Sequence, residues 1–327
     1  MTNMNYLQHY RNFKAFFAAR IVILLYIILS VNPLSGYAQD PVLPAMNLGL
    51  TNIKDAVAPP TGLYYNSYTQ VFQSHGNYGG SGKELPGDLH INYLLSLHQV
   101  IYLSPIHLAG GNVHFTALLP LVKIDADNED NILPSVNRAV TGDLTLGTGI
   151  QWSDKKLFGQ SFWHRVELDV SLPTGAYDQK YNINPSSHLY ALAAYYSFTY
   201  YLIPGLSIGS RNQINYNFTA IGSQARPGIF YNGNYSFGYD ITSRFHTALA
   251  GYYLKQFEQD AFQGNRSYYR DKFGIDNTRE QVIGIGPALS YTTSGGVFIE
   301  AKVFFETQAE NRPEGTRPTL RLAIPLK

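Results

Sequence analysis

Apolar and polar residues alternate one for one along much of this 327-residue chain. The clearest case is residues 161–178, where Arg165, Glu167 and Asp169 alternate with Val166, Leu168 and Val170. Successive side chains of a strand point to opposite faces, so a strand here has one charged face and one apolar face. This pattern predicts an exposed, two-sided β-strand.

The same alternation recurs along the chain and predicts an all-β fold of about twelve strands. The predicted strands cover residues 63–74, 88–103, 113–121, 143–151, 161–178, 190–200, 211–218, 229–239, 242–257, 283–291, 297–306 and 320–326. In the second strand the apolar face is expected to carry Leu95 and Leu97, and the polar face Ser96 and His98.

The lengths of the connections between these strands alternate as well. Odd-numbered connections are long and polar, at residues 76–86, 126–140, 174–188, 222–227, 259–280 and 309–317, whereas the even ones are mostly tight. The fourth connection, 153–160, is longer than this rule predicts. Long extracellular loops and short periplasmic turns are typical of an antiparallel, up-and-down transmembrane β-barrel, and a soluble barrel has no reason to sort its loops in this way.

A barrel in lipid must close, because every backbone hydrogen bond has to be satisfied internally. The polar faces of its strands then line the lumen, where charges of both signs can pair and narrow it. The predicted lumen-facing residues of the substrate pathway are Arg165, Glu167, Asp169, Arg211, Gln213, Asn215, Glu300, Lys302 and Glu306.

The N-terminus resembles a secretory signal peptide spanning residues 1–38. Arg11, Lys14 and Arg20 precede a short apolar run, and small residues lead to a cleavage site after Ala38. The alternative is an uncleaved membrane anchor, but the run is shorter than the roughly 20 apolar residues of a spanning helix. Residues 39–61 then read as an irregular periplasmic arm or plug, and residues 62–327 as the barrel.

Composition supports a barrel at a polar–apolar boundary. The chain has 26 tyrosines, 14% charged residues, no cysteine and a net charge of +1, which predicts no nucleic-acid partner. The tyrosines have two interpretations, interfacial girdles or lumen residues that stack an aromatic solute. They include Tyr64, Tyr65, Tyr93, Tyr177, Tyr196, Tyr200, Tyr231 and Tyr239.

No residue pattern predicts an enzyme, a metal or a cofactor. His90 and His98 share a strand face but lie roughly 26 Å apart along it, too far to ligate one ion. Residues 125–130 are acidic, yet they lack the glycine of a calcium loop, and position twelve is Val136. No local Ser/His/Asp spacing suggests nucleophilic catalysis.

Several short stretches, in order, resemble the family called Putative MetA-pathway of phenol degradation, a group of bacterial outer-membrane β-barrels. They are Ala58–Tyr64, Gly142–Gly147, Leu172–Tyr177, Gly251–Tyr253 with Gln256 and Asp260, Gly286–Pro287, and Asn311–Gly315, which contains Arg312. The resemblance implies a passive channel in the outer membrane of a Gram-negative bacterium for small hydrophobic or aromatic compounds.

The partners expected of such a barrel are outer-membrane lipid, lipopolysaccharide and the barrel-assembly machinery. An alternative stays open at this point: a closed structural or adhesive barrel that acts through its extracellular loops, above all residues 259–280.

Overall fold

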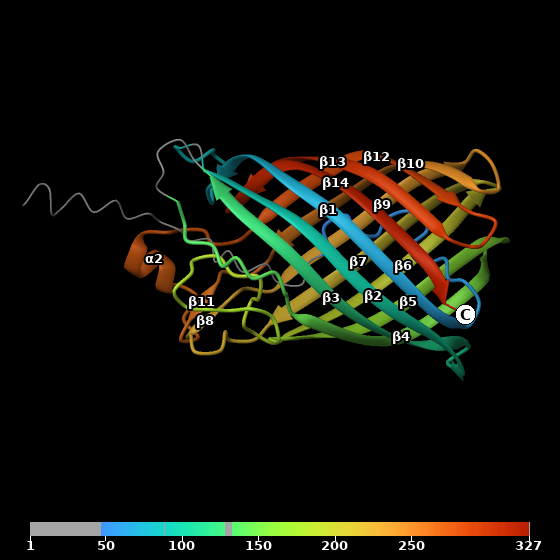
Figure 1. Cartoon of the computed structure of the whole chain (residues 1–327), viewed down its shortest axis with the longest axis horizontal. Coiled ribbons are helices and arrows are strands. Elements are labelled where there is room, and N and C mark those ends of the chain that lie inside the picture. The colour runs from blue at the N-terminus through green and yellow to red at the C-terminus, as the bar shows by residue number, and fades with distance from the viewer. Residues whose placement is uncertain (1–46, 88, 128–132, 327) are drawn as a thin grey trace, which may run out of the picture. The chain divides into compact units, whose positions relative to one another are not determined.

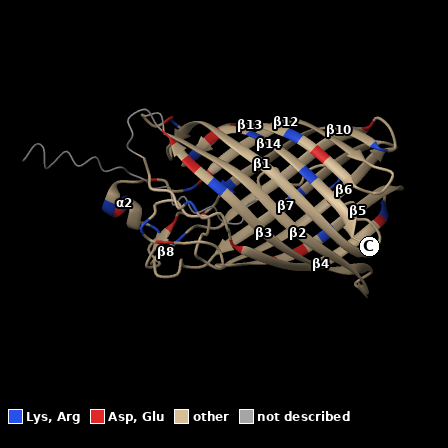
Figure 2. Ribbon diagram, viewed as in Figure 1, with Lys and Arg blue, Asp and Glu red and all other residues tan. Residues whose placement is uncertain are grey.

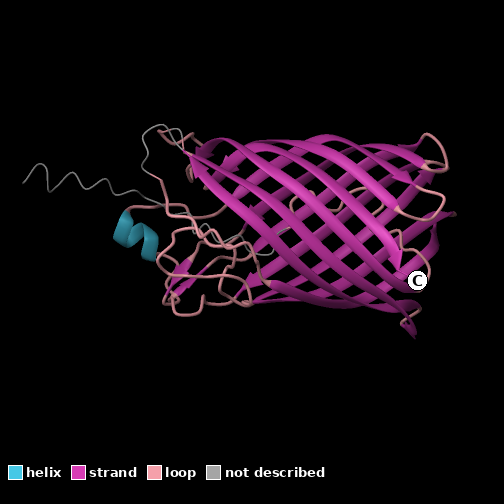
Figure 3. Ribbon diagram, in the orientation of Figure 1, coloured by secondary structure: helices cyan, strands magenta, loops and turns pink. Residues whose placement is uncertain are grey.

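Twelve long strands close into one antiparallel barrel in the computed structural model (Figures 1 and 3). The model describes residues 47–326 apart from 88 and 128–132, so the expected signal peptide lies outside the described residues. Each barrel strand pairs with its neighbours in the chain, and the first pairs with the last to close the barrel. The predicted all-β, up-and-down fold class is confirmed.

The barrel strands are 11–19 residues long. They are β1 (Gly62–Tyr78), β2 (His90–Leu108), β3 (Gly111–Asp127), β4 (Leu144–Leu157), β5 (Gln160–Leu172), β6 (Ala191–Ile203), β7 (Leu206–Asn217), β9 (Phe230–Asp240), β10 (Phe245–Gln256), β12 (Gln281–Thr292), β13 (Phe298–Glu310) and β14 (Arg312–Leu326). Two short strands, β8 (Ala225–Arg226) and β11 (Ala261–Phe262), pair with each other, and α2 (Tyr268–Phe273) follows them.

The two ends of the barrel differ, and we call them the turn end and the loop end. Tight turns and the C-terminus gather at the turn end, whereas β8, β11 and α2 lie beyond the loop end (Figure 1). Three turns contain only two residues, Ala109–Gly110, Phe158–Gly159 and Pro204–Gly205, and both residues of the first two turns have positive φ. This conformation matches the twist of the strands that such a turn joins.

Two predicted connections were wrong in length. The fourth is a two-residue turn, because β4 extends to Leu157 rather than ending near Gln151. The eleventh, expected to be a long loop over 309–317, consists of Asn311 alone, with φ of 51°. Polar residues in this region are typical of a loop. Here they belong to the ends of β13 and β14, which extend as strands beyond the apolar band.

The outer face of the barrel is apolar, as the alternation predicts for most strands. Exposed side chains on this face include Phe115, Leu146, Leu168, Leu192, Tyr216, Phe237, Leu249, Ile285, Phe305 and Leu320. A continuous apolar band around a closed barrel is what lipid requires of a transmembrane barrel.

The facing of β2 corrects the sequence prediction. Leu97 points into the lumen and is buried, whereas Ser96 and His98 point outward. The outward polar atoms satisfy one another, since His98 Nδ1 lies 2.5 Å from the hydroxyl of Tyr65 and Nε2 lies 3.2 Å from Ser96 Oγ. Both faces of β2 are rich in apolar residues, so alternation could not decide which one faced lipid.

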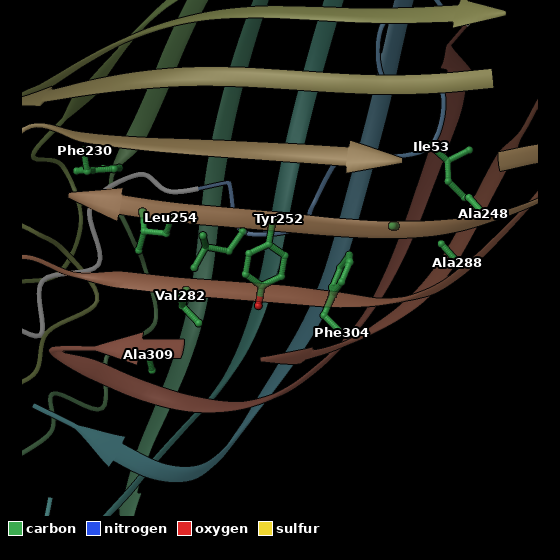
Figure 4. Close-up of a cluster of buried hydrophobic side chains, with 11 residues drawn as sticks. Ile53, Phe230, Ala248, Tyr252, Leu254, Val282, Ala288, Phe304 and Ala309 are labelled. Carbon is green, nitrogen blue, oxygen red and sulfur yellow. The ribbon is translucent and has the colours of Figure 1, made fainter. Parts of the chain in front are cut away.

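Residues 47–60, here called the plug, run inside the barrel before β1 begins. The largest of the buried hydrophobic clusters in the described residues forms between this segment and the inner wall of β9, β10, β12 and β13 (Figure 4). The plug contributes Leu48 and Ile53 to the cluster, and the wall contributes Tyr252 and Phe304 among others. A smaller cluster joins Leu50 of the plug to Tyr68 and Leu97, so the plug packs mainly on one side of the interior and also reaches the opposite wall.

Candidate functional site

The plug has no regular secondary structure of its own. Hydrogen bonds between its backbone and wall side chains hold it in place. Gly49 N donates to Asn234 Oδ1 at 2.9 Å, and Lys302 Nζ donates to the carbonyl of Leu50 at 2.9 Å. Farther along, Gln151 Nε2 donates to the carbonyl of Ala56 at 2.9 Å. Buried backbone groups need such partners, and polar wall residues supply them here.

Close packing also holds the plug against one wall. Gly49 has a φ of 71° and lies directly against the rings of Phe304 and Tyr252, where a β-carbon would clash with both. Glycine therefore serves both the backbone conformation and the close approach. Ile53 is fully buried beside Ala248 and Ala288 (Figure 4).

The plug leaves a cavity of about 180 Å³ in the loop-end half of the lumen, the upper cavity. Its two walls differ in chemistry. The apolar wall, on β2 and β3, consists of Tyr93, Leu95, Leu97, Leu118, Pro120 and Val122. The polar wall, on β5 and β7, consists of Glu167, Asp169, Ser171, Arg211, Gln213 and Asn215. An apolar cavity of about 150 Å³ is large enough to hold benzene, so this one can enclose one aromatic ring.

A second cavity of about 370 Å³, the lower cavity, occupies the turn-end half. Its lining includes Tyr64, Arg244 and Pro325 near the turns and Asp55 of the plug. Five residues line both cavities: Thr51, Tyr68, Gln99, Glu167 and Arg211. The two cavities thus meet on the β1–β7 side of the barrel, opposite the wall that the plug covers.

Charged residues of both signs lie on the strands along the barrel (Figure 2). One group surrounds Asp55 of the plug, whose carboxylate accepts hydrogen bonds from Arg165 Nη2 at 3.3 Å and Ser197 Oγ at 2.7 Å. Glu167 on the wall is bonded by His114 Nε2 at 2.7 Å and by the hydroxyl of Tyr195. This group lies where the two cavities meet.

Two further groups lie on β13 and β14. Lys302 is bonded to Glu300 at 2.7 Å, and Arg321 lies 3.6 Å from the same carboxylate. Glu306 accepts from Arg317 Nη2 at 2.7 Å, and this guanidinium also stacks on Phe72. In these two groups each carboxylate lies beside a cationic side chain, which is the usual condition for charge burial.

Polar amides continue the wall above Arg211. Arg211 Nη2 donates to Gln213 Oε1 at 3.1 Å, and Gln213 Nε2 donates to Asn215 Oδ1 at 2.7 Å. Asn215 Nδ2 donates to Asn232 Oδ1 at 2.8 Å. Asp169 lines the upper cavity beside this ladder. All nine predicted pathway residues thus have interior positions, in three groups that the sequence did not distinguish.

Sequence analysis missed Asp55, Arg317 and the apolar wall. Asp55 lies in a segment without strand periodicity, so nothing in the sequence aligned it with the barrel charges. Arg317 falls in the region that was predicted to be a loop. The apolar wall could have been found from β2 and β3, which have apolar residues on both faces. A barrel strand needs apolar residues on its inner face only where the lumen is also apolar.

The family-motif residues form one network at the loop end. Gln256 Nε2 donates to Asp260 Oδ1 at 2.7 Å, and Asn311 Nδ2 donates to the carbonyls of Asn277 and Arg279. Arg312 Nη1 donates to Glu280 Oε2 at 3.0 Å. These bonds hold the loop between β10 and β12 over the plugged side of the barrel.

Asp260 carries the strongest electrostatic perturbation in these loops. Burial raises the pKa of its carboxyl to about 6, although hydrogen bonds from Gly228 N, Gln256 and Thr278 oppose the shift. Its role is structural, because its oxygens bond to the loops that it joins.

A different carboxylate holds the loops over the upper cavity. Asp143 accepts hydrogen bonds from Gly175 N, Ser186 Oγ, and both the backbone and hydroxyl of Ser187, at 2.6–2.9 Å. The loop between β5 and β6 consequently folds inward, and its Ile183 packs on Val122 and Ile124 at the top of the apolar wall.

The structure places the tyrosines in both of the environments that were considered. Tyr93 lines the upper cavity and bonds to Arg317, and Tyr64 lines the lower cavity. Tyr196 and Tyr239 are exposed on the outer face. Tyr177 lies in a loop, stacked on His188 at 4.1 Å.

Among residues 47–326, outside the undescribed positions, no cluster of three or more histidine or acidic residues could hold a metal ion. Residues 128–130 of the acidic stretch lie outside the described part of the chain. No helix in the described residues is long and apolar enough to cross a membrane.

The closed barrel, its apolar outer band and its sorted ends define an outer-membrane β-barrel of a Gram-negative bacterium. Within that class, the family model described as Putative MetA-pathway of phenol degradation matches residues 74–322, and the chain belongs to this family. No curated protein matches the chain.

One of the similar solved structures superimposes well enough to show the same fold. The COG4313 outer membrane channel from Pseudomonas putida F1 is 13% identical, covers 84% of this chain and 100% of its own, and superimposes with a TM-score of 0.70. The TodX monoaromatic hydrocarbon channel, in a deltaS2 mutant form, is 7% identical, covering 84% of this chain and 91% of its own, with a TM-score of 0.40. The translocator domain of the autotransporter NalP from Neisseria meningitidis is 8% identical, covering 82% and 90%, with a TM-score of 0.45.

Proposed function

We propose that this protein is an outer-membrane channel through which small hydrophobic or aromatic compounds diffuse passively in either direction. The observation that carries the proposal is the upper cavity, which can enclose one aromatic ring between an apolar and a polar wall. Membership of a family described by phenol degradation and the likeness to a channel structure support it.

The proposed route follows the side of the barrel that the plug leaves free. A solute enters beneath the loop held by Asp143, moves along the apolar wall, and passes the residues shared by the two cavities into the lower one. Arg211 and Glu167 at this passage set the constriction. Glu300 and Lys302 act by holding the plug rather than by contacting the solute.

The partners in this proposal are membrane lipid, lipopolysaccharide, small hydrophobic or aromatic solutes and the assembly machinery that inserts the barrel. Neither a cofactor nor a chemical step is needed, because diffusion through a lumen requires only binding sites that are favourable enough to enter and weak enough to leave.

Transport should be measured in vesicles whose outer leaflet is lipopolysaccharide, because aromatic solutes cross plain phospholipid bilayers without a channel. The refolded protein is expected to accelerate the entry of phenol and benzyl alcohol over protein-free vesicles, and to exclude sugars. Replacing Arg211 with alanine should change the entry rate of both solutes, whereas D154N, at an exposed residue near the turn end of β4, should not. Equal entry of sugars and aromatics would indicate a general porin instead.

A second function is favoured by the plug itself, because it occupies part of the lumen and is held there by hydrogen bonds and packing. In this alternative the barrel is closed, and the loop between β10 and β12 carries a structural or adhesive role. Folded protein that admits no solute at all would support it, as would a loop deletion that abolishes function but leaves permeation unchanged.

A further inference from the structure

The plug carries a carboxylate into a binding site that the barrel wall provides. Asp55 is 6% exposed, and both of its oxygens lie 3.3 Å from Arg165 Nη2 on β5. Ser197 on β6 donates to it at 2.7 Å, and Arg211 Nη1 on β7 lies 3.9 Å away. Three adjacent strands thus contribute to one carboxylate site.

The wall around this site has more cations than carboxylates. Two of its acidic residues already have wall partners: Glu167 lies 3.6 Å from Arg165 Nε, and Glu300 is bonded to Lys302 and lies near Arg321. The cationic residues are Arg165, Arg211, Lys302 and Arg321, and the acidic ones are Glu167, Asp169 and Glu300. The negative charge that balances the wall comes from Asp55, on the plug.

Arg211 is incompletely bonded, although it is buried. Its guanidinium stacks on the ring of Tyr195 at 3.4 Å and donates to Gln213, but its Nε has no hydrogen-bond partner among the described residues. A buried donor without a partner costs free energy unless a ligand or water satisfies it. Arg211 also lines both cavities, so it lies where a passing solute would arrive.

We propose that Arg165, Ser197 and Arg211 form a binding site for the carboxylate of a small aromatic acid, and that Asp55 occupies this site as an internal competitor. The inference rests on the proposed channel function and names its substrate class. Arginine pairs that bond a carboxylate from the plug can bond one from a solute by the same charge-assisted geometry.

The aromatic part of the ligand has a surface opposite the site. Leu97 and Leu118 face the same cavity as Arg211, so an aromatic ring can rest on the apolar wall while its carboxylate points toward the guanidinium. A neutral aromatic of the same shape gains the apolar contact but cannot replace the charge of Asp55. The site therefore favours the acid over its neutral analogue once Asp55 withdraws.

Benzoate and benzamide test this proposal, because they share a shape and differ in charge. Binding to the folded full-length protein and entry into lipopolysaccharide-faced vesicles are compared for wild type, D55N, R165Q and the double variant D55N/R165Q. D154N, which neutralises an exposed carboxylate near the turn end of β4, is the matched control. Heat-modifiable migration on gels verifies folding of each variant.

D55N is expected to raise benzoate affinity about tenfold relative to benzamide, the effect of one charge-assisted hydrogen bond. R165Q should lower the benzoate-to-benzamide ratio below that of wild type, and the double variant should lose the gain of D55N. R165Q keeps the test decisive even if D55N does not fold. A ratio unchanged in D55N and R165Q would overturn the proposal, as would equal gains for both probes, which would mean that Asp55 is only a steric obstacle.

The outcome is separable from that of the channel proposal. Entry of benzyl alcohol and benzamide with no preference for benzoate in any variant would refute the carboxylate site and leave the channel intact. Absence of entry for every solute, from protein shown to be folded, would refute the channel itself.

Discussion

The barrel has two apolar inner walls, and they differ in what covers them. The wall of β9–β13 is covered by the plug, so that Phe304 and Tyr252 are fully buried against Leu48, Gly49 and Ile53. The wall of β2 and β3 has apolar residues of similar kind, but in its middle they line the upper cavity. The same chemistry therefore stabilises the fold on one side and offers a binding surface on the other.

The difference comes from what lies opposite each wall. The plug binds where wall polar groups, such as Asn234 and Lys302, satisfy its backbone next to an apolar surface. Opposite β2 and β3 stand the charged and amide side chains of β5 and β7, which bond mainly to one another. No described backbone fills the space between them, so a solute can.

Removing residues 47–57 should have the largest effect on this comparison. Both walls would then face solvent. The conductance of the barrel should rise on the order of tenfold, because the plug would no longer occupy the lumen. Planar-bilayer recordings of folded protein measure the change, and the intact β1 should preserve barrel closure. An unchanged conductance would mean that the loops, not the plug, limit flow.

Single truncations should separate the two walls. Phe304→Ala should lower the free energy of unfolding by about 3–5 kcal/mol, because it opens a hole under the packed plug. Leu97→Ala should cost no more than about 2 kcal/mol, because its side chain packs on Leu50 of the plug but also borders the upper cavity, and it should instead weaken benzyl alcohol binding. Urea titration gives the first quantity and binding measurements the second.

The opposite pattern, with stability lost at Leu97 and binding lost at Phe304, would show that the walls have been assigned the wrong roles. Leu168→Ala on the outer face is a suitable control, because its side chain is 66% exposed. It should change neither quantity appreciably.

The sequence predicted the barrel far better than its interior. Strand number and connectivity follow from a period of two and from sorted loop lengths, and these depend on local residues alone. The charges at Arg165, Arg211 and Glu300 could be placed inside because their strands have a clear apolar face for lipid.

The facing of β2 and the site around Asp55 could not be predicted in this way. Where both faces of a strand are apolar, the register with neighbouring strands decides which face is outside. Asp55 meets Arg165 across 110 residues of sequence, and its segment has no period that could align the two. Long-range pairing of an irregular segment leaves no local signal.

The loops above the two walls should differ in pH dependence. Over the plugged side, burial raises the pKa of Asp260 to about 6, so the carboxyl is protonated in the folded loop at pH values where it ionises when exposed. Its contribution to loop stability is therefore greatest below about pH 4 and declines as pH rises to about 6, by about 3 kcal/mol.

Hydrogen exchange of residues 257–280 between pH 4 and pH 7, corrected for intrinsic rates, measures this change. D260N should remove most of the dependence, because asparagine does not ionise. Residues 174–190, over the other wall, serve as the internal reference. Equal pH dependence in both loops would contradict the assignment to Asp260.

Ser187→Ala should have the smallest effect, confined to the loop over the open wall. The variant loses the hydroxyl bond to Asp143 Oδ2 at 2.8 Å but keeps the backbone bond to the same oxygen. One hydrogen bond to a charged group contributes roughly 1–2 kcal/mol, so amides of residues 174–190 should exchange about tenfold faster. Because this loop covers the upper cavity with Ile183, benzyl alcohol should also enter somewhat faster.

Ser267→Ala, whose hydroxyl does not cap α2, should change neither rate. Faster exchange without faster entry would show that solutes reach the cavity by another opening.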